Sequence, residues 1–154
     1  YQHLISIFNL FGVYATMNVD EPEKLDVVYK RANVIAESFD LKKLHPGSLA
    51  TFFISIAYAY ASSGNTERAL DVLEDYTDLV TGDIFPLKLK GDSFFDLIGE
   101  WLDELDLGVE MPRDERTVRQ SMYDAVHNPA FSSMTDNPRF QIIVRRLEDQ
   151  FQEE

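Results

Sequence analysis

The segment that decides the fold is 53–73, which reads FISIAYAYASSGNTERALDVL. Apolar residues recur at helical spacing on both sides of Gly64, so this segment predicts two antiparallel helices joined by a short turn. We expect Ala57 and Ala69 where the two helices cross most closely, because small side chains allow the backbones to approach. Larger side chains then fill the seam beside these contacts: Phe53, Tyr60 and Leu73.

The same segment resembles a tetratricopeptide repeat, a pair of antiparallel helices that stacks into an α-solenoid. The positions that agree with the repeat are Phe53, Ile56, Ala57, Tyr60, Gly64, Ala69 and Leu73. Phe53 stands in the usual Trp position, and Tyr76 stands where the repeat usually has Ala. The resemblance implies a binding surface, because repeats of this kind bind far more often than they catalyse.

A weaker copy of this spacing lies upstream, at Phe8, Phe11, Gly12, Ala15, Leu25, Tyr29 and Ala32. Gly12 and Ala57 are 45 residues apart, more than the regular repeat length of about 34, and the 40–47 connection accounts for the excess. Two unrelated amphipathic helices could also match such a template, so both interpretations of the first pair stay open.

The C-terminal residues resemble the short ending that closes bacterial tetratricopeptide regions. The matching stretches are NPAF at 128–131, DNPRF at 136–140 and RRL at 145–147. Pro129 and Pro138 fit the starts of helices, and we expect Phe131 and Phe140 to cover the apolar edge of the last pair. Taken whole, the chain resembles the C-terminal sensor half of bacterial helix-turn-helix transcription regulators of the tetratricopeptide type. This resemblance implies a regulatory domain that binds a protein or peptide, forms a homodimer, or does both.

The periodic segments predict an all-α chain, an α-solenoid of antiparallel helix pairs (TPR-like) with six to seven helices. Their expected ranges are 2–17, 22–39, 48–62, 65–80, 92–106, 113–127 and 137–152. We expect one domain over 1–154, with two helix pairs in 1–82 and the C-terminal helices and cap in 83–154. The chain begins without Met and almost inside a helical pattern, which predicts an additional upstream domain.

Charge and composition limit the classes of partner and chemistry that this chain can have. The net charge of −13 should repel nucleic acid and anionic membranes, so we expect neither as a direct partner. Residues 65–110 carry 13 acids and 3 bases, whereas 111–147 carry 6 arginines and 4 acids, so the basic end should neutralise part of the acidic middle within the fold. The absence of cysteine excludes disulfides and thiolate catalysis and favours a cytoplasmic location.

The sequence contains no catalytic motif that we can identify. His3, His45 and His127 lie in separate segments without a His or carboxylate at the four-residue spacing of a zinc helix. Phosphate-binding glycine loops and the G-x-S-x-G motif are absent from the sequence. We therefore expect a protein that is not an enzyme and needs neither a cofactor nor a metal.

The predicted helix 92–106 leaves a second interpretation open. Its acids recur every four residues, and arginines recur on the next predicted helix: Asp92, Asp96, Glu100 and Glu104, then Arg113, Arg116 and Arg119. These groups could form a solvated face, an internal ion-pair zipper, a dock for a basic partner, or the carboxylates of a small metal-dependent hydrolase. The apolar residues around Trp101 could belong to the core or to an oligomer contact.

In an array of this type the first helix of each pair lines a concave groove. The residues predicted to face that groove are Ser6, Asn9, Val13, Thr16, Thr51, Ile54 and Tyr58. The Asn9 amide can both donate to and accept from a peptide backbone, although an exposed polar residue would have the same pattern. An adaptor or scaffold that is not linked to DNA would share these features.

Overall fold

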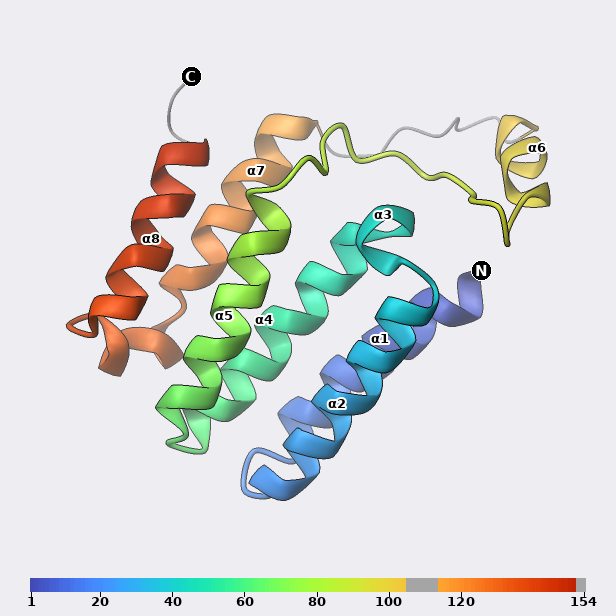
Figure 1. Ribbon diagram of the computed structural model, residues 1–154. Helices are drawn as coiled ribbons and strands as arrows, with labels where there is room; N and C mark the ends of the chain where they lie inside the picture. The colour runs from blue at the N-terminus through green and yellow to red at the C-terminus, as the bar shows by residue number, and fades with distance from the viewer. Residues whose placement is uncertain (105–113, 152–154) are drawn as a thin grey trace.

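The computed structural model describes residues 1–104 and 114–151, and in these ranges every regular element is a helix (Figure 1). The elements are α1 (Gln2–Met17), α2 (Pro22–Ser38), α3 (Leu41–Leu44), α4 (Pro46–Ser62), α5 (Thr66–Val80), α6 (Leu97–Asp103), α7 (Glu115–Asp124), the 3₁₀ segments η1 (Ala125–His127) and η2 (Pro129–Met134), and α8 (Pro138–Phe151). The all-α prediction is confirmed. No helix within the described ranges is long and apolar enough to cross a membrane.

The α4–α5 hairpin forms the centre of the molecule, and it follows directly from the deciding segment. Gly64 has a φ of 77°, a conformation that glycine adopts without steric cost, and it ends the turn after α4. Asn65 then caps α5 by accepting a hydrogen bond from the Arg68 backbone N–H at 3.4 Å. Ala57 and Ala69 are completely buried, as predicted for residues at the contact between these helices.

α1 lies beside α4 and runs in the same direction. The ring centroids of Phe8 and Phe52 are 5.7 Å apart, and one turn later a Cβ on Gly12 would be 3.2 Å from Oγ of Ser55. The missing side chain of Gly12 therefore allows the two helices to approach closely. α2 covers the same hairpin, with Leu25 fully buried.

The C-terminal helices pack on the other side of α5 (Figure 1). Phe131 and Phe140 are both buried, and their ring centroids lie 6.5 Å apart. This agrees with the prediction that these two side chains cover an apolar edge. The predicted helix 113–127 is shorter than expected, because α7 ends at Asp124 and the chain continues in the 3₁₀ segments η1 and η2.

The predicted helix 92–106 is wrong in its first part. The Asp92 carboxylate accepts hydrogen bonds from the backbone N–H groups of Phe94 and Phe95 at 2.9 and 2.8 Å. Asp96 similarly accepts from the N–H of Leu97, where α6 begins. Both acids therefore stabilise a turn and the start of a short helix, and Asp92 lies outside the helix that carries Glu100.

Candidate functional site

A mostly apolar hollow of about 560 Å³ lies between α4 and α7, and we call it the α4–α7 hollow. Thr51 and Ile54 line it from α4, and Val118 and Met122 line it from α7. Leu87, from the segment that crosses after α5, also borders it. Each helix contributes residues three and four positions apart, so one face of α4 is opposite one face of α7.

The floor of the α4–α7 hollow is Tyr76 of α5, which is 1% exposed. Its hydroxyl donates a 2.7 Å hydrogen bond to the backbone carbonyl of Met122. Burial raises the pKa of Tyr76 above its ordinary value, so the phenol remains a neutral donor. This bond joins α5 to α7 beneath the hollow and fixes one of its walls.

His45 lies at the end of the hollow where α4 begins. Its Nδ1 accepts a 3.2 Å hydrogen bond from the backbone N–H of Ser48, so the imidazole is the N-cap of α4. Burial lowers the pKa of His45, which keeps the ring neutral and able to accept that bond. The hollow therefore has no charged side chain at this end.

Arg119 fastens α7 to two other parts of the chain. Its guanidinium lies 4.1 Å from the ring centroid of Phe85 and 5.9 Å from that of Phe151 at the end of α8. Nε of the same group donates a 2.8 Å hydrogen bond to Glu115. The contacts described for Arg119 are thus with these partners and not with the acids of segment 92–106, the zipper that was one of the alternatives for this helix; residues 105–106 and Arg113 lie outside the described residues.

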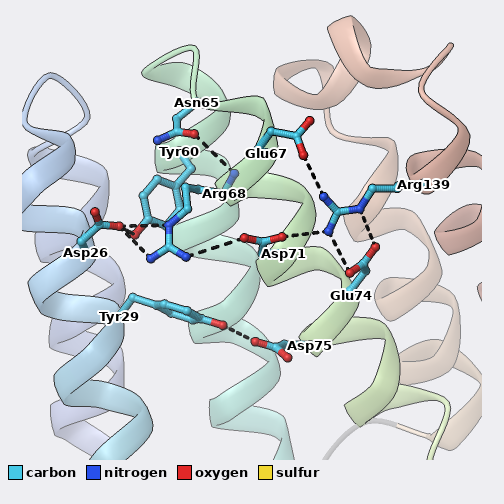
Figure 2. A network of polar contacts seen from close by, with 10 residues as sticks. All are labelled: Asp26, Tyr29, Tyr60, Asn65, Glu67, Arg68, Asp71, Glu74, Asp75 and Arg139. Carbon is cyan, nitrogen blue, oxygen red and sulfur yellow. Dashed lines mark hydrogen bonds and ion pairs between the residues drawn. The ribbon is translucent and has the colours of Figure 1, made fainter.

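A network of charged and polar side chains holds α2, α4 and α5 together (Figure 2). Asp26 of α2 accepts hydrogen bonds from the Tyr60 hydroxyl at 2.5 Å and from Nη2 of Arg68 at 2.9 Å. Desolvation raises the pKa of Asp26, but these two bonds outweigh it and hold that pKa below its ordinary value. Tyr29 of α2 also bonds to Asp75 of α5.

Arg139 of α8 continues this network on the other side of α5 (Figure 2). Its guanidinium donates to Glu67, Asp71 and Glu74 at 2.8–2.9 Å. The bonds to Glu74 and Asp71 raise the pKa of Arg139, and the cation offsets the repulsion among the three acids. The basic C-terminal part of the chain therefore neutralises α5, as the charge distribution predicted.

The structure divides the predicted groove residues among different places. Thr51 and Ile54 line the α4–α7 hollow, whereas Val13 lines a separate hollow between α1 and α2. The others are exposed side chains of α1 and α4: Ser6, Asn9, Thr16 and Tyr58. No hollow described here contains all seven.

The serine and threonine hydroxyl groups among these residues donate hydrogen bonds within their own helices. Ser6 donates to the carbonyl of Gln2, and Thr51 donates to that of Gly47. Thr16 similarly donates to the carbonyl of Val13. These side chains therefore present acceptor oxygens to a ligand, while their only donor is occupied.

Sequence reasoning missed the α7 wall of the hollow. The residues concerned are Val118, Ser121, Met122 and Ala125. The signal was present, because Val118, Met122 and Ala125 form an apolar stripe at i, i+4 and i+7 in an otherwise polar helix. The sequence could not supply the position of that stripe opposite α4, because this position depends on packing between segments that are far apart in the sequence.

Within residues 1–104 and 114–151, no group of three His, Asp or Glu side chains is placed to hold a metal ion. Among the described residues, those that line the α4–α7 hollow include no Asp, Glu, Lys or Arg. This mostly apolar lining has the chemistry to accommodate an apolar group.

No protein-family model matches this chain, and no curated protein or solved structure matches it.

Proposed function

We propose that this chain is a non-enzymatic regulatory domain, a TPR-like α-solenoid that binds a peptide segment of a protein ligand. The observation that carries the proposal is the uncharged hollow between α4 and α7, which is lined mainly by apolar side chains. Hollows of a few hundred Å³ with a few polar groups are the usual form of a ligand site. The tetratricopeptide resemblance of segment 53–73 supports the same function.

The ligand follows from the chemistry of the lining. Ile54, Val118 and Met122 favour an apolar or aromatic side chain, which gains free energy when it leaves water. A protein of net charge −13 attracts a basic peptide, repels an acidic one and does not oppose a neutral one. We therefore propose a neutral or basic peptide that inserts one large apolar side chain.

A role in transcription is the second element of this proposal. The resemblance of the whole chain to the sensor half of bacterial helix-turn-helix regulators supports a cytoplasmic domain that reports ligand binding to an upstream DNA-binding domain. An adaptor protein with the same fold is the alternative. The coding sequence upstream of residue 1 distinguishes them: an in-frame helix-turn-helix segment supports the regulator, and a different upstream domain supports the adaptor.

The binding site can be tested by filling the hollow. Short random peptides displayed on phage are selected on the immobilised chain, and the selected peptides are titrated by calorimetry. Ser121 lies on the hollow side of α7 and is exposed, so Ser121→Trp should fill the space and weaken the peptides at least ~10-fold. A selected peptide that binds Ser121→Trp as tightly as the unmodified chain would place its site elsewhere.

Gln120→Trp is the matched control. Gln120 is also exposed and uncharged, but it lies next to Ser121 in the sequence and so about 100° away around the helix, outside the residues that line the hollow. The same bulky side chain is therefore introduced into the same helix on another face. Peptide affinity should remain unchanged in this variant.

A further inference from the structure

α1 carries two apolar stripes, and the fold covers only one of them. The buried stripe consists of Leu4, Phe8, Gly12 and Ala15. The outer stripe consists of Leu10, Val13, Tyr14 and Met17, which are 66%, 56%, 45% and 77% exposed. The outer residues follow the i, i+3, i+4, i+7 spacing of a helix-packing surface, and a helix that is apolar on all sides is normally buried on all sides. The outer stripe therefore has the character of a contact surface.

α2 extends this surface. A hollow of about 720 Å³ lies between the outer stripe of α1 and α2, which lines it with Glu23, Lys24, Val27, Val28 and Arg31. Three of these follow one another at four-residue spacing: Glu23, Val27 and Arg31. Val27 is 50% exposed. We call the outer stripe together with these three residues the α1–α2 face. It has an apolar centre with Glu23 and Arg31 at its edge, and the neighbouring Lys24 is paired with Glu21 of its own chain at 2.7 Å.

We propose that a second copy of this chain covers the α1–α2 face and forms a two-fold symmetric dimer. Two copies that each carry a net charge of −13 repel one another, so they can associate only where the meeting surfaces are free of excess acid. α1 contains no Asp, Glu, Lys or Arg in its 16 residues. Its outer stripe is therefore a surface at which the copies can meet without repulsion.

The charges on α2 suit a two-fold axis. Glu23 and Arg31 each lie four residues, about one helical turn, from Val27. If the two copies of α2 approach antiparallel with Val27 at the axis, Glu23 of one copy faces Arg31 of the other, and the same pair forms twice. Self-complementarity of this kind is the defining property of an isologous interface.

The size of the face agrees with a dimer. α1 is 16 residues long, about 24 Å, and two adjacent helices are about 20 Å wide. The face therefore projects to roughly 500 Å² per copy, or about 1,000 Å² for the pair, which is the lower limit for a specific interface. The other exposed apolar group, Phe94, Leu97 and Trp101, lies beside the exposed acids Asp96 and Glu100. In a dimer formed through that surface, Asp96 and Glu100 of one copy would lie close to the same acids of the other copy. Their repulsion disfavours that surface as the dimer interface.

Sedimentation velocity across a range of protein concentrations tests the dimer. The unmodified chain should show a concentration-dependent shift from monomer to dimer. Val13→Glu should raise the dimer dissociation constant at least ~100-fold, because symmetry places the buried charge in the interface twice. Ile142→Glu is the control, because Ile142 of α8 is 57% exposed and Val13 is 56% exposed, and it should leave dimerisation unchanged. A chain that stays monomeric at all concentrations, or a dimer that tolerates Val13→Glu, would overturn the proposal.

Charge exchange tests the two-fold arrangement itself. Glu23→Arg and Arg31→Glu should each weaken the dimer several-fold, and the double variant should restore it, because every cross-axis pair regains opposite signs. A double variant weaker than both single variants would contradict the proposed axis. These measurements are independent of the α4–α7 hollow, so a monomeric chain that still binds peptide would refute the dimer and leave the proposed function intact.

Discussion

Arg139 of α8 and Asp71 of α5 are joined by a 2.8 Å hydrogen bond, although 68 positions separate them in the sequence. The other carboxylate oxygen of Asp71 lies 3.6 Å from Nη1 of Arg68, and Arg68 in turn donates to Asp26 of α2. A line of alternating charges therefore crosses the molecule from α2 over α5 to α8 (Figure 2). It connects α2 to α8 through residues of α5.

Arg139→Met should lower the free energy of unfolding by about 1–2 kcal/mol. The change removes the cation shared by Glu67, Asp71 and Glu74 and leaves three acids together on one helix face. The Arg139 side chain is 35% exposed, so water screens its ion pairs and limits the loss of stability. Urea denaturation measures the free energy of unfolding. Arg145→Met, at an exposed position of α8, is the control. Equal destabilisation in the two variants would contradict the network's role.

His45 should make stability depend on pH. Burial lowers the pKa of His45 below its ordinary value of 6.5, so the unfolded chain binds the proton more readily than the folded chain. Stability is then fully present above about pH 6.5 and decreases as the pH falls through the folded pKa. Protonation of Nδ1 also removes the acceptor that caps the Ser48 N–H.

His45→Asn keeps a capping acceptor but does not titrate. Thermal denaturation from pH 7.5 down to about 5 should therefore show a smaller loss of stability in this variant than in the unmodified chain. His3→Asn, at an exposed position of α1, should retain the full dependence. If His45→Asn and the unmodified chain lose stability in parallel as the pH falls, the buried imidazole is not the source of the pH dependence.

The close crossings should not tolerate larger side chains. Ala57 is completely buried between α4 and its neighbours, so Ala57→Leu should cost about 1–3 kcal/mol through overpacking. Ala61→Leu, one turn later at a half-buried position, should cost clearly less. Denaturant titration measures the free energy of unfolding of both variants. If the two variants lose similar amounts of stability, Ala57 is not at a tight helix contact.

Local signals explain how much of this fold the sequence could predict. α1, α2, α4, α5 and α8 each have a strong helical period, and proline or a turn glycine marks their ends, so their bounds agree with prediction to within about two residues. The first part of segment 92–106 was wrong, because charge spacing was interpreted as a helix face that begins at residue 92, whereas the helix begins at Leu97. Asp92 and Asp96 instead bond to backbone N–H groups just after them, an alternative that aspartate always offers.

The site could be predicted only in part, because its two walls are distant in the sequence. Thr51 and Ile54 were identified from the packing pattern of α4 alone, since their side of that helix is fixed by the buried Phe53 and Ala57. Opposite them lies Val118, and this pairing depends on long-range packing. No local pattern in the sequence specifies it.

The last prediction asks whether a peptide extends from the α4–α7 hollow across α4 to α1. Ser55 lines the hollow and also meets Gly12, so α1 borders the site and Asn9 is one turn away from Gly12 on the same helix. We expect Ile54→Ala to weaken the peptides selected on this chain by removing apolar contact. Asn9→Ala should also weaken them by about 1–3 kcal/mol, because peptide groups that the amide satisfies become unpaired.

Calorimetric titration of both variants separates the two parts of the site. Asn9 is exposed, so its removal should leave the unfolding transition unchanged, and any loss of affinity then belongs to binding. Gln150→Ala, which removes an exposed amide from α8, should have no effect on affinity. If Ile54→Ala weakens the peptide while Asn9→Ala does not, the ligand is confined to the α4–α7 hollow and the extended groove is wrong.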